Sequence, residues 1–152
     1  MLQLNNIDNI LNFAIDAEQE AFDFYMNLAN KLSNNQMKAV FEGFAKEEIA
    51  HKAKLMKIKE EGAFDDYKRE KIDDLKMEEY VVAVKPNPNM TYKEALVLAM
   101  KKEKSAFRLY SNLASIANND ILKNVLLMLA QEEAKHKLRF ELEYDEFVLR
   151  EN

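Results

Sequence analysis

Apolar residues recur every three or four positions along four long stretches of the chain, which is the spacing of residues on one face of an α-helix. This pattern predicts helices over residues 7–32, 36–61, 92–117 and 121–149. The first two and the last two are separated only by short polar breaks that contain helix-capping residue types. Because these breaks are so short, we expect the helices on either side of each one to be antiparallel neighbours.

Two local signals mark further helix ends. Thr91 and Glu94 have the spacing of a capping box at the start of the third helix, and Gly62 suits the C-terminal cap of the second. Between them lies a linker, residues 63–90, whose length would allow it to reach roughly 90 Å if extended. A helix over residues 36–61 measures only about 39 Å. The linker can therefore cross over along the whole length of a bundle.

The composition agrees with an all-α fold. The chain has 152 residues, which suits one domain over residues 1–152, and it contains only 2 Gly and 2 Pro. The net charge is −5 with mixed signs, so no nucleic-acid partner is expected. Neither a signal peptide nor an apolar run of membrane-spanning length is present, which predicts a cytoplasmic protein with no membrane partner. The absence of cysteine excludes a Cys-ligated iron site within these residues.

An internal repeat relates the two predicted helix pairs. When residue i is aligned with residue i+85, 17 of the 42 pairs between residues 11–52 and 96–137 are identical without a gap. The period is too long for a solenoid and there are only two copies. We interpret the chain as a duplicated pair of helices, 7–61 and 92–149.

Glutamate and histidine interrupt each apolar stripe near its middle. The motif Glu-x-x-His occurs in both copies, and its histidines are the only two in the chain. A further glutamate stands on the helix that precedes each motif. The six candidate metal ligands are Glu18, Glu48, His51, Glu103, Glu133 and His136.

Burial in a core restricts the charge states and partners that these six side chains can have. A buried carboxylate must be paired, protonated or metal-bound, and no Lys or Arg occupies the four stripes. Two divalent cations would balance four carboxylates, and oxygen and imidazole ligands suit iron, manganese or zinc. The alternative is a bundle without metal in which a buried polar layer fixes the helix register.

The chain resembles the ferritin-like superfamily, and within it the rubrerythrin group of di-iron proteins. The resemblance rests on residues 14–18 with Phe22 and Tyr25, on residues 47–51, and on the copies of these segments. It implies a ferritin-like four-helix bundle with a long crossover between the second and third helices. It also implies a site for two iron ions.

The resemblance assigns a role to each candidate ligand. Glu18 and Glu103 would each bind one ion, and Glu48 and Glu133 would bridge the two. His51 and His136 would each complete one ion, and no catalytic residue is expected beyond the ligands. Tyr25 and Tyr110 would hydrogen-bond to the ligating carboxylates, with ordinary core packing as the alternative for both tyrosines.

The function implied by the resemblance is reduction of hydrogen peroxide or dioxygen by a rubrerythrin-like oxidoreductase. The chain lacks both the four-cysteine module and the extra glutamate near Glu103 that rubrerythrins usually carry. Electrons would therefore come from a separate donor, such as a rubredoxin-like protein, and a homodimer is expected. Iron oxidation and storage, a manganese catalase and a metal-binding bundle without redox activity remain as alternatives.

Overall fold

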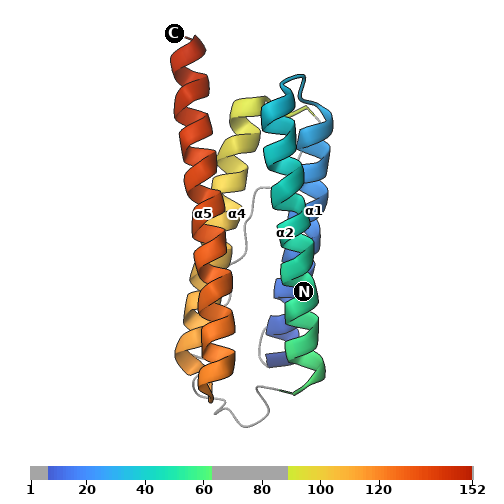
Figure 1. Ribbon diagram of the computed structural model, residues 1–152, viewed down its shortest axis with the longest axis vertical. Helices are drawn as coiled ribbons and strands as arrows, with labels where there is room; N and C mark the ends of the chain where they lie inside the picture. The colour runs from blue at the N-terminus through green and yellow to red at the C-terminus, as the bar shows by residue number, and fades with distance from the viewer. Residues whose placement is uncertain (1–6, 63–88, 152) are drawn as a thin grey trace. The chain divides into compact units, whose positions relative to one another are not determined.

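The computed structural model describes residues 7–62 and 89–151, and these residues form helices without any strand (Figure 1). The four helices are α1 (Ile7–Asn30), α2 (Asn35–Glu60), α4 (Tyr92–Ile116) and α5 (Asp120–Glu151). Each boundary lies within two residues of its predicted position. The all-α prediction and the four predicted helices are thus confirmed.

The chain divides into two compact units, one built on α1 and α2 and the other on α4 and α5. Within each unit the two helices run antiparallel, as Figure 1 shows for the blue and green pair and for the yellow and red pair. The predicted crossover lies outside the described residues except for residues 89 and 90. The prediction of a single domain over residues 1–152 stays a prediction.

Side-chain caps explain where the second helix of each unit begins. The Asn34 side chain accepts hydrogen bonds from the backbone N–H groups of Gln36, at 2.9 Å, and Met37, at 3.2 Å. In the second unit, the Asn119 side chain accepts one from the backbone N–H of Leu122 at 2.8 Å. Both asparagines satisfy donors that have no partner within the first helical turn. The repeat therefore reproduces the cap as well as the helix.

The other two predicted helix ends are also confirmed. The Glu94 backbone N–H donates to Thr91 Oγ1 at 3.1 Å, and the Thr91 N–H donates to the Glu94 carboxylate at 3.3 Å, which completes the capping box. Gly62 follows the end of α2 with a φ of 64°, a left-handed conformation that glycine adopts without a steric penalty.

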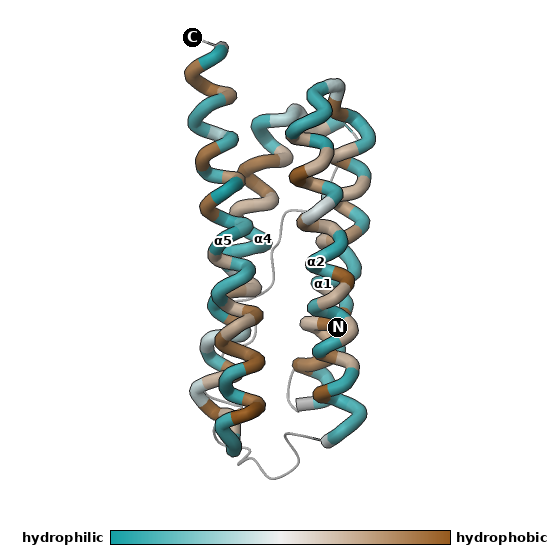
Figure 2. The backbone as a smooth tube through the Cα atoms, in the orientation of Figure 1, coloured by the Kyte–Doolittle hydropathy of each residue, from teal (hydrophilic) through white to brown (hydrophobic). Residues whose placement is uncertain are grey.

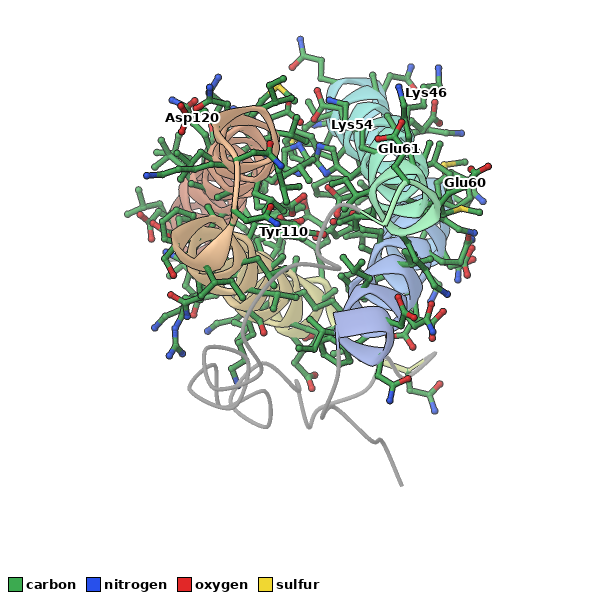
Figure 3. All side chains as sticks on the ribbon, turned by 90° about the horizontal axis from the view of Figure 1, so that it is seen from below. Lys46, Lys54, Glu60, Glu61, Tyr110 and Asp120 are labelled. Carbon is green, nitrogen blue, oxygen red and sulfur yellow. The ribbon has the colours of Figure 1, made fainter. Side chains whose placement is uncertain are left out.

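The predicted apolar stripes are largely buried. Figure 2 shows hydrophobic and hydrophilic residues alternating along all four helices, as expected for amphipathic helices. In Figure 3 the labelled Lys46, Glu60 and Asp120 extend away from their own helix pairs, whereas Tyr110 of α4 is buried. Four residues that follow the three-to-four-residue spacing of the stripes are only partly buried, namely Leu32, Phe44, Ala106 and Ala117. None of the helices in the described part of the chain is both long enough and apolar enough to span a membrane.

Candidate metal centre

The first helix pair brings three of the predicted ligands together. Glu18 lies on α1, and Glu48 and His51 lie one turn apart on α2, so all three share one face of the pair. Their exposed fractions are 2%, 2% and 1%. The His51 Nδ1 atom lies 3.5 Å from Glu48 Oε1 and 3.7 Å from Glu18 Oε2. We call these three residues the first triad.

The second helix pair repeats this arrangement. Glu103 on α4 and Glu133 and His136 on α5 form the second triad, with exposed fractions of 1%, 0% and 2%. The His136 Nδ1 atom lies 3.7 Å from Glu103 Oε1, the same separation as between the corresponding atoms of the first triad. The duplicated sequence has therefore produced the same kind of three-residue cluster in both helix pairs.

The geometry of each triad fits a metal ion better than it fits direct hydrogen bonding. Within each triad, one potential ligand atom from every residue lies within 4.8 Å of the others. Two ligand atoms that each bind an ion at about 2.1 Å are roughly 3.0 to 3.6 Å apart at the usual bond angles. The measured separations of 3.5 and 3.7 Å are close to this range and exceed normal hydrogen-bond lengths.

Buried polar atoms that make no hydrogen bond also favour a metal ion in each triad. Among the described residues, the two histidine Nδ1 atoms and at least one carboxylate oxygen of each glutamate in the triads make no hydrogen bond, although these residues engage in other interactions. In the described part of the chain, the buried polar side chains include no Lys or Arg that could neutralise the glutamates. Each triad thus has two carboxylates and one imidazole, a donor set that one divalent cation satisfies.

The two tyrosines expected near the ligands are core residues. Tyr25 and Tyr110 are 0% and 1% exposed, and Tyr25 packs edge-on against Phe24 with ring centroids 5.6 Å apart. The packing agrees with the simpler interpretation of these side chains. Hydrogen bonds from them to the ligating carboxylates remain a prediction.

One buried acidic residue was not anticipated. Glu143 on α5 is 3% exposed, and its Oε1 atom accepts hydrogen bonds from the Tyr92 hydroxyl at 2.9 Å and from the Arg150 guanidinium at 3.3 Å. Burial, together with the hydrogen bond to Glu143, raises the pKa of Tyr92 well above its ordinary value. The sequence did contain a signal for it, because Glu143 continues the spacing of buried residues through His136 and Phe140.

No curated protein matches the chain. A solved structure from Thermotoga maritima, assigned to the ferritin-like diiron-carboxylate proteins, matches with a TM-score of 0.68 and 22% sequence identity. The match covers 91% of this chain and 93% of that one, so the fold is ferritin-like.

The sequence pattern of the rubrerythrin family matches residues 9–92 and 94–152. The chain therefore belongs to the rubrerythrin family. The matched ranges include both triads, in agreement with the resemblance that the Glu-x-x-His motifs carry. The assignment of the six residues as ligands stays a prediction.

Proposed function

We propose that this protein is a di-iron oxidoreductase that reduces hydrogen peroxide or dioxygen with electrons from a separate donor. The observation that carries the proposal is the pair of buried Glu-Glu-His triads, each with its ligand atoms within 4.8 Å. Family membership and the diiron-carboxylate assignment of the structural relative support iron as the metal. Manganese and zinc fit the same ligand types.

In this proposal each triad holds one ion, and one glutamate from each triad is shared. Glu18 and Glu103 would be the unshared carboxylates, and His51 and His136 would each supply an imidazole nitrogen to one ion. Glu48 and Glu133 would be the shared carboxylates. The four glutamates together carry a charge of −4, which would offset two divalent cations.

When bound, a pair of ferrous ions supplies the two electrons that reduce one peroxide, with two protons, to two molecules of water. The protein contributes a preformed set of ligands in a core from which water is excluded, as the exposed fractions of 0–2% for the six side chains indicate. Carboxylates can change between one-oxygen and two-oxygen binding, so they can follow a change in metal charge without movement of the helices.

The electrons must return from outside these residues. The 152 residues contain no cysteine, and the described residues offer no second group of ligands outside the two triads that resembles a redox centre. We therefore propose a separate donor, such as a rubredoxin-like protein. The donor would dock over the helices that carry the ligands.

The proposal is tested with protein that has been loaded with iron and reduced without oxygen. On addition of peroxide, we expect rapid oxidation of two irons per chain and a much lower rate of peroxide consumption in Glu48→Ala. Glu47→Ala is the matched control, because Glu47 is exposed and adjacent to Glu48, and it should keep the rate. Equal rates in Glu48→Ala and the unaltered protein would reject a peroxide-reducing site at this position.

Other outcomes separate the alternatives. Iron that reacts quickly with dioxygen but accumulates well beyond two ions per chain would favour iron storage. Two manganese ions in protein purified without added metal would favour a catalase. Bound metal with no reaction toward either oxidant would favour a structural or sensing role.

A further inference from the structure

The exposed side of α4 carries a row of basic side chains. Their spacings of 8, 3 and 4 residues place them on one side of the helix, and the row extends about 22 Å along the helix axis. The four residues, all exposed, are Lys93, Lys101, Lys104 and Arg108. We call them the α4 basic stripe.

The corresponding helix of the first pair has the opposite charge. Three positions of the stripe are occupied in α1 by exposed aspartates, namely Asp8, Asp16 and Asp23. Over its whole length α1 contains five acidic residues and no Lys or Arg, whereas α4 contains five basic and two acidic residues. Both helices contribute one glutamate to a triad, so neither the helix pair nor the candidate metal centre requires the basic stripe. The inverted charge therefore indicates a role for the surface of α4 that α1 does not share.

The stripe lies on the helix that supplies Glu103 to the second triad. Lys104 follows Glu103 directly, and Lys101 and Arg108 lie within two turns of it. Phe107, one turn after Glu103, is 39% exposed, and helical periodicity places it between the stripe and the buried side of α4. A protein docked on this surface would be separated from the buried side of α4 by about the width of one helix, roughly 10 Å.

The length and charge of the stripe restrict what it can bind. A small anion could contact only one or two cations of a row about 22 Å long, so the stripe fits a larger acidic surface. Four cations make a short site for a nucleic acid, and the net charge of −5 on the whole chain would repel a polyanion. The exposed Phe107 ring beside the cations is typical of protein interfaces, in which aromatic residues are enriched. The occupant that fits is a protein with an acidic face.

We propose that the α4 basic stripe is the docking surface for an acidic electron-donor protein that reduces the candidate metal centre. This inference rests on the proposed function, which needs a separate donor because the 152 residues contain no cysteine. A rubredoxin-like donor would be oxidised from iron(II) to iron(III) as it passed one electron to the centre, so two donors would dock in turn for each peroxide. Attraction between opposite charges speeds the encounter, and a small, polar contact lets the oxidised donor leave.

Binding of a redox-inert donor tests the docking surface by itself. The probe is an acidic rubredoxin with zinc in place of iron, titrated calorimetrically into the full chain with its own metal at low salt. Lys101→Glu/Lys104→Glu/Arg108→Glu should raise the dissociation constant about tenfold or more, with unchanged helical circular dichroism and metal content. The affinity of the unaltered chain should fall as salt is added.

A variant with the same change of net charge on the first pair is the matched control. Lys31→Glu/Lys46→Glu/Lys57→Glu replaces three exposed lysines of that unit and should keep most of the affinity. Equal losses in the two triple variants would show that only the net charge matters and would overturn the proposal. An unaltered chain that does not bind the zinc rubredoxin, or that binds a DNA duplex more tightly, would overturn it as well.

Reduction kinetics separate the docking surface from the proposed function. The rate at which iron(II) rubredoxin reduces the oxidised, iron-loaded protein should fall about tenfold in the stripe variant and stay close to the original value in the control. A chain that binds the zinc rubredoxin through the stripe but consumes no peroxide would support the docking surface and reject the proposed function. A chain that consumes peroxide after chemical reduction but does not bind the rubredoxin would reject the docking surface alone.

Discussion

The two helix pairs have equivalent residues in their middle layers but different residues at their ends and on their outer faces. Glu48 and His51 have equivalents in Glu133 and His136 with closely similar burial, and both pairs begin their second helix with an asparagine cap. By contrast, the position of Ile58 in the first pair is occupied by Glu143 in the second. The residues that the candidate metal centre needs have stayed the same, while the residues that determine what each pair contacts have diverged.

Ile58 and Glu143, which stand at corresponding positions, show that the two pairs pack their helix ends differently. Ile58 is buried, and its apolar side chain requires no hydrogen-bond partner. Glu143 at the corresponding place requires hydrogen-bond donors, which Tyr92 and Arg150 supply. The second pair has thereby gained a specific polar contact between the start of α4 and the end of α5.

The largest expected effect comes from removing ligands in one pair at a time. Glu18→Ala should leave about one ion per chain, because only the first triad loses an unshared carboxylate. Glu48→Ala and Glu133→Ala should each lose both ions if these glutamates bridge. Metal content measured by mass spectrometry after dialysis distinguishes the two patterns. Loss of a single ion in Glu48→Ala would show that the triads bind independently.

Matched controls exist for both bridging glutamates. Glu47→Ala and Glu132→Ala change residues that immediately precede Glu48 and Glu133 but do not belong to the triads. Both variants should retain two ions per chain. A loss of metal in either control would mean that the neighbouring acids also contribute to binding.

The next largest effect concerns the protein without metal. Each triad then buries two carboxylates without a counter-ion, and substituting one of them with a neutral isostere removes part of this cost. The metal-free Glu133→Gln variant should be more stable than the metal-free unaltered protein by about 1 to 4 kcal/mol at pH 7. Urea unfolding after chelation measures this difference. A metal-free variant of lower stability would indicate that Glu133 is held by protein donors.

The sequence was sufficient to predict the helices because each boundary is encoded locally. Asn34, Thr91 with Glu94, and Gly62 each act through atoms within four residues of the helix end, so the residue type alone reveals the boundary. The two triads were predictable for a related reason. The i, i+3 spacing within a helix and the 85-residue repeat both leave a visible pattern in the sequence.

Features that occur in only one copy were not predicted. Glu143 has no acidic counterpart in the first pair, because Ile58 stands at the corresponding position, so the alignment of the copies indicated a buried position there but not an acid. The partners of Glu143 are also distant in sequence, since Tyr92 precedes it by 51 residues. Contacts of this kind depend on the tertiary packing of the pair and cannot be read from local spacing.

A double-mutant cycle on Tyr92 and Glu143 would isolate the contact that distinguishes the second pair. Tyr92→Phe and Glu143→Leu should each cost about 1 to 3 kcal/mol, because each leaves a polar partner without its hydrogen bond. The double variant should cost less than the sum of the two, with a coupling of about 1 kcal/mol. Urea unfolding of the four proteins provides the values, and strict additivity would contradict a direct contact.

The contact between Tyr92 and Glu143 also predicts the direction in which the stability of the fold changes with pH. Burial first and the hydrogen bond to Glu143 second raise the pKa of Tyr92 above 10.0, so the folded state holds the hydroxyl proton more tightly than the unfolded state. This stabilisation is complete below pH 10 and decreases as the pH rises further toward the folded-state pKa. Tyr92→Phe lacks this contribution, so the stability difference between the two proteins should shrink above pH 10.

The smallest expected effect concerns a lysine beside each histidine. In the first pair, the Lys52 ammonium donates to Gln19 Oε1 at 2.8 Å. The corresponding residues of the second pair are both lysines, Lys104 and Lys137, and there Lys137 pairs with Glu141 on its own helix. The first pair has no acid at the position of Glu141. Each lysine thus has one partner, but the two partners come from different helices.

Gln19→Lys would give the first pair two neighbouring lysines, as Lys104 and Lys137 are in the second pair, but no acid at the position of Glu141. Lys52 would lose its acceptor and gain a neighbouring positive charge, which should cost about 0.5 to 1 kcal/mol at low salt and less at high salt. Adding Met56→Glu supplies an acid four residues after Lys52, as Glu141 does for Lys137, and should recover most of the loss. Thermal unfolding at two salt concentrations measures both steps. If adding Met56→Glu restored no stability, the surroundings of Lys52 and Lys137 would differ by more than one acidic residue. Residues on the neighbouring helices would then also contribute to the difference.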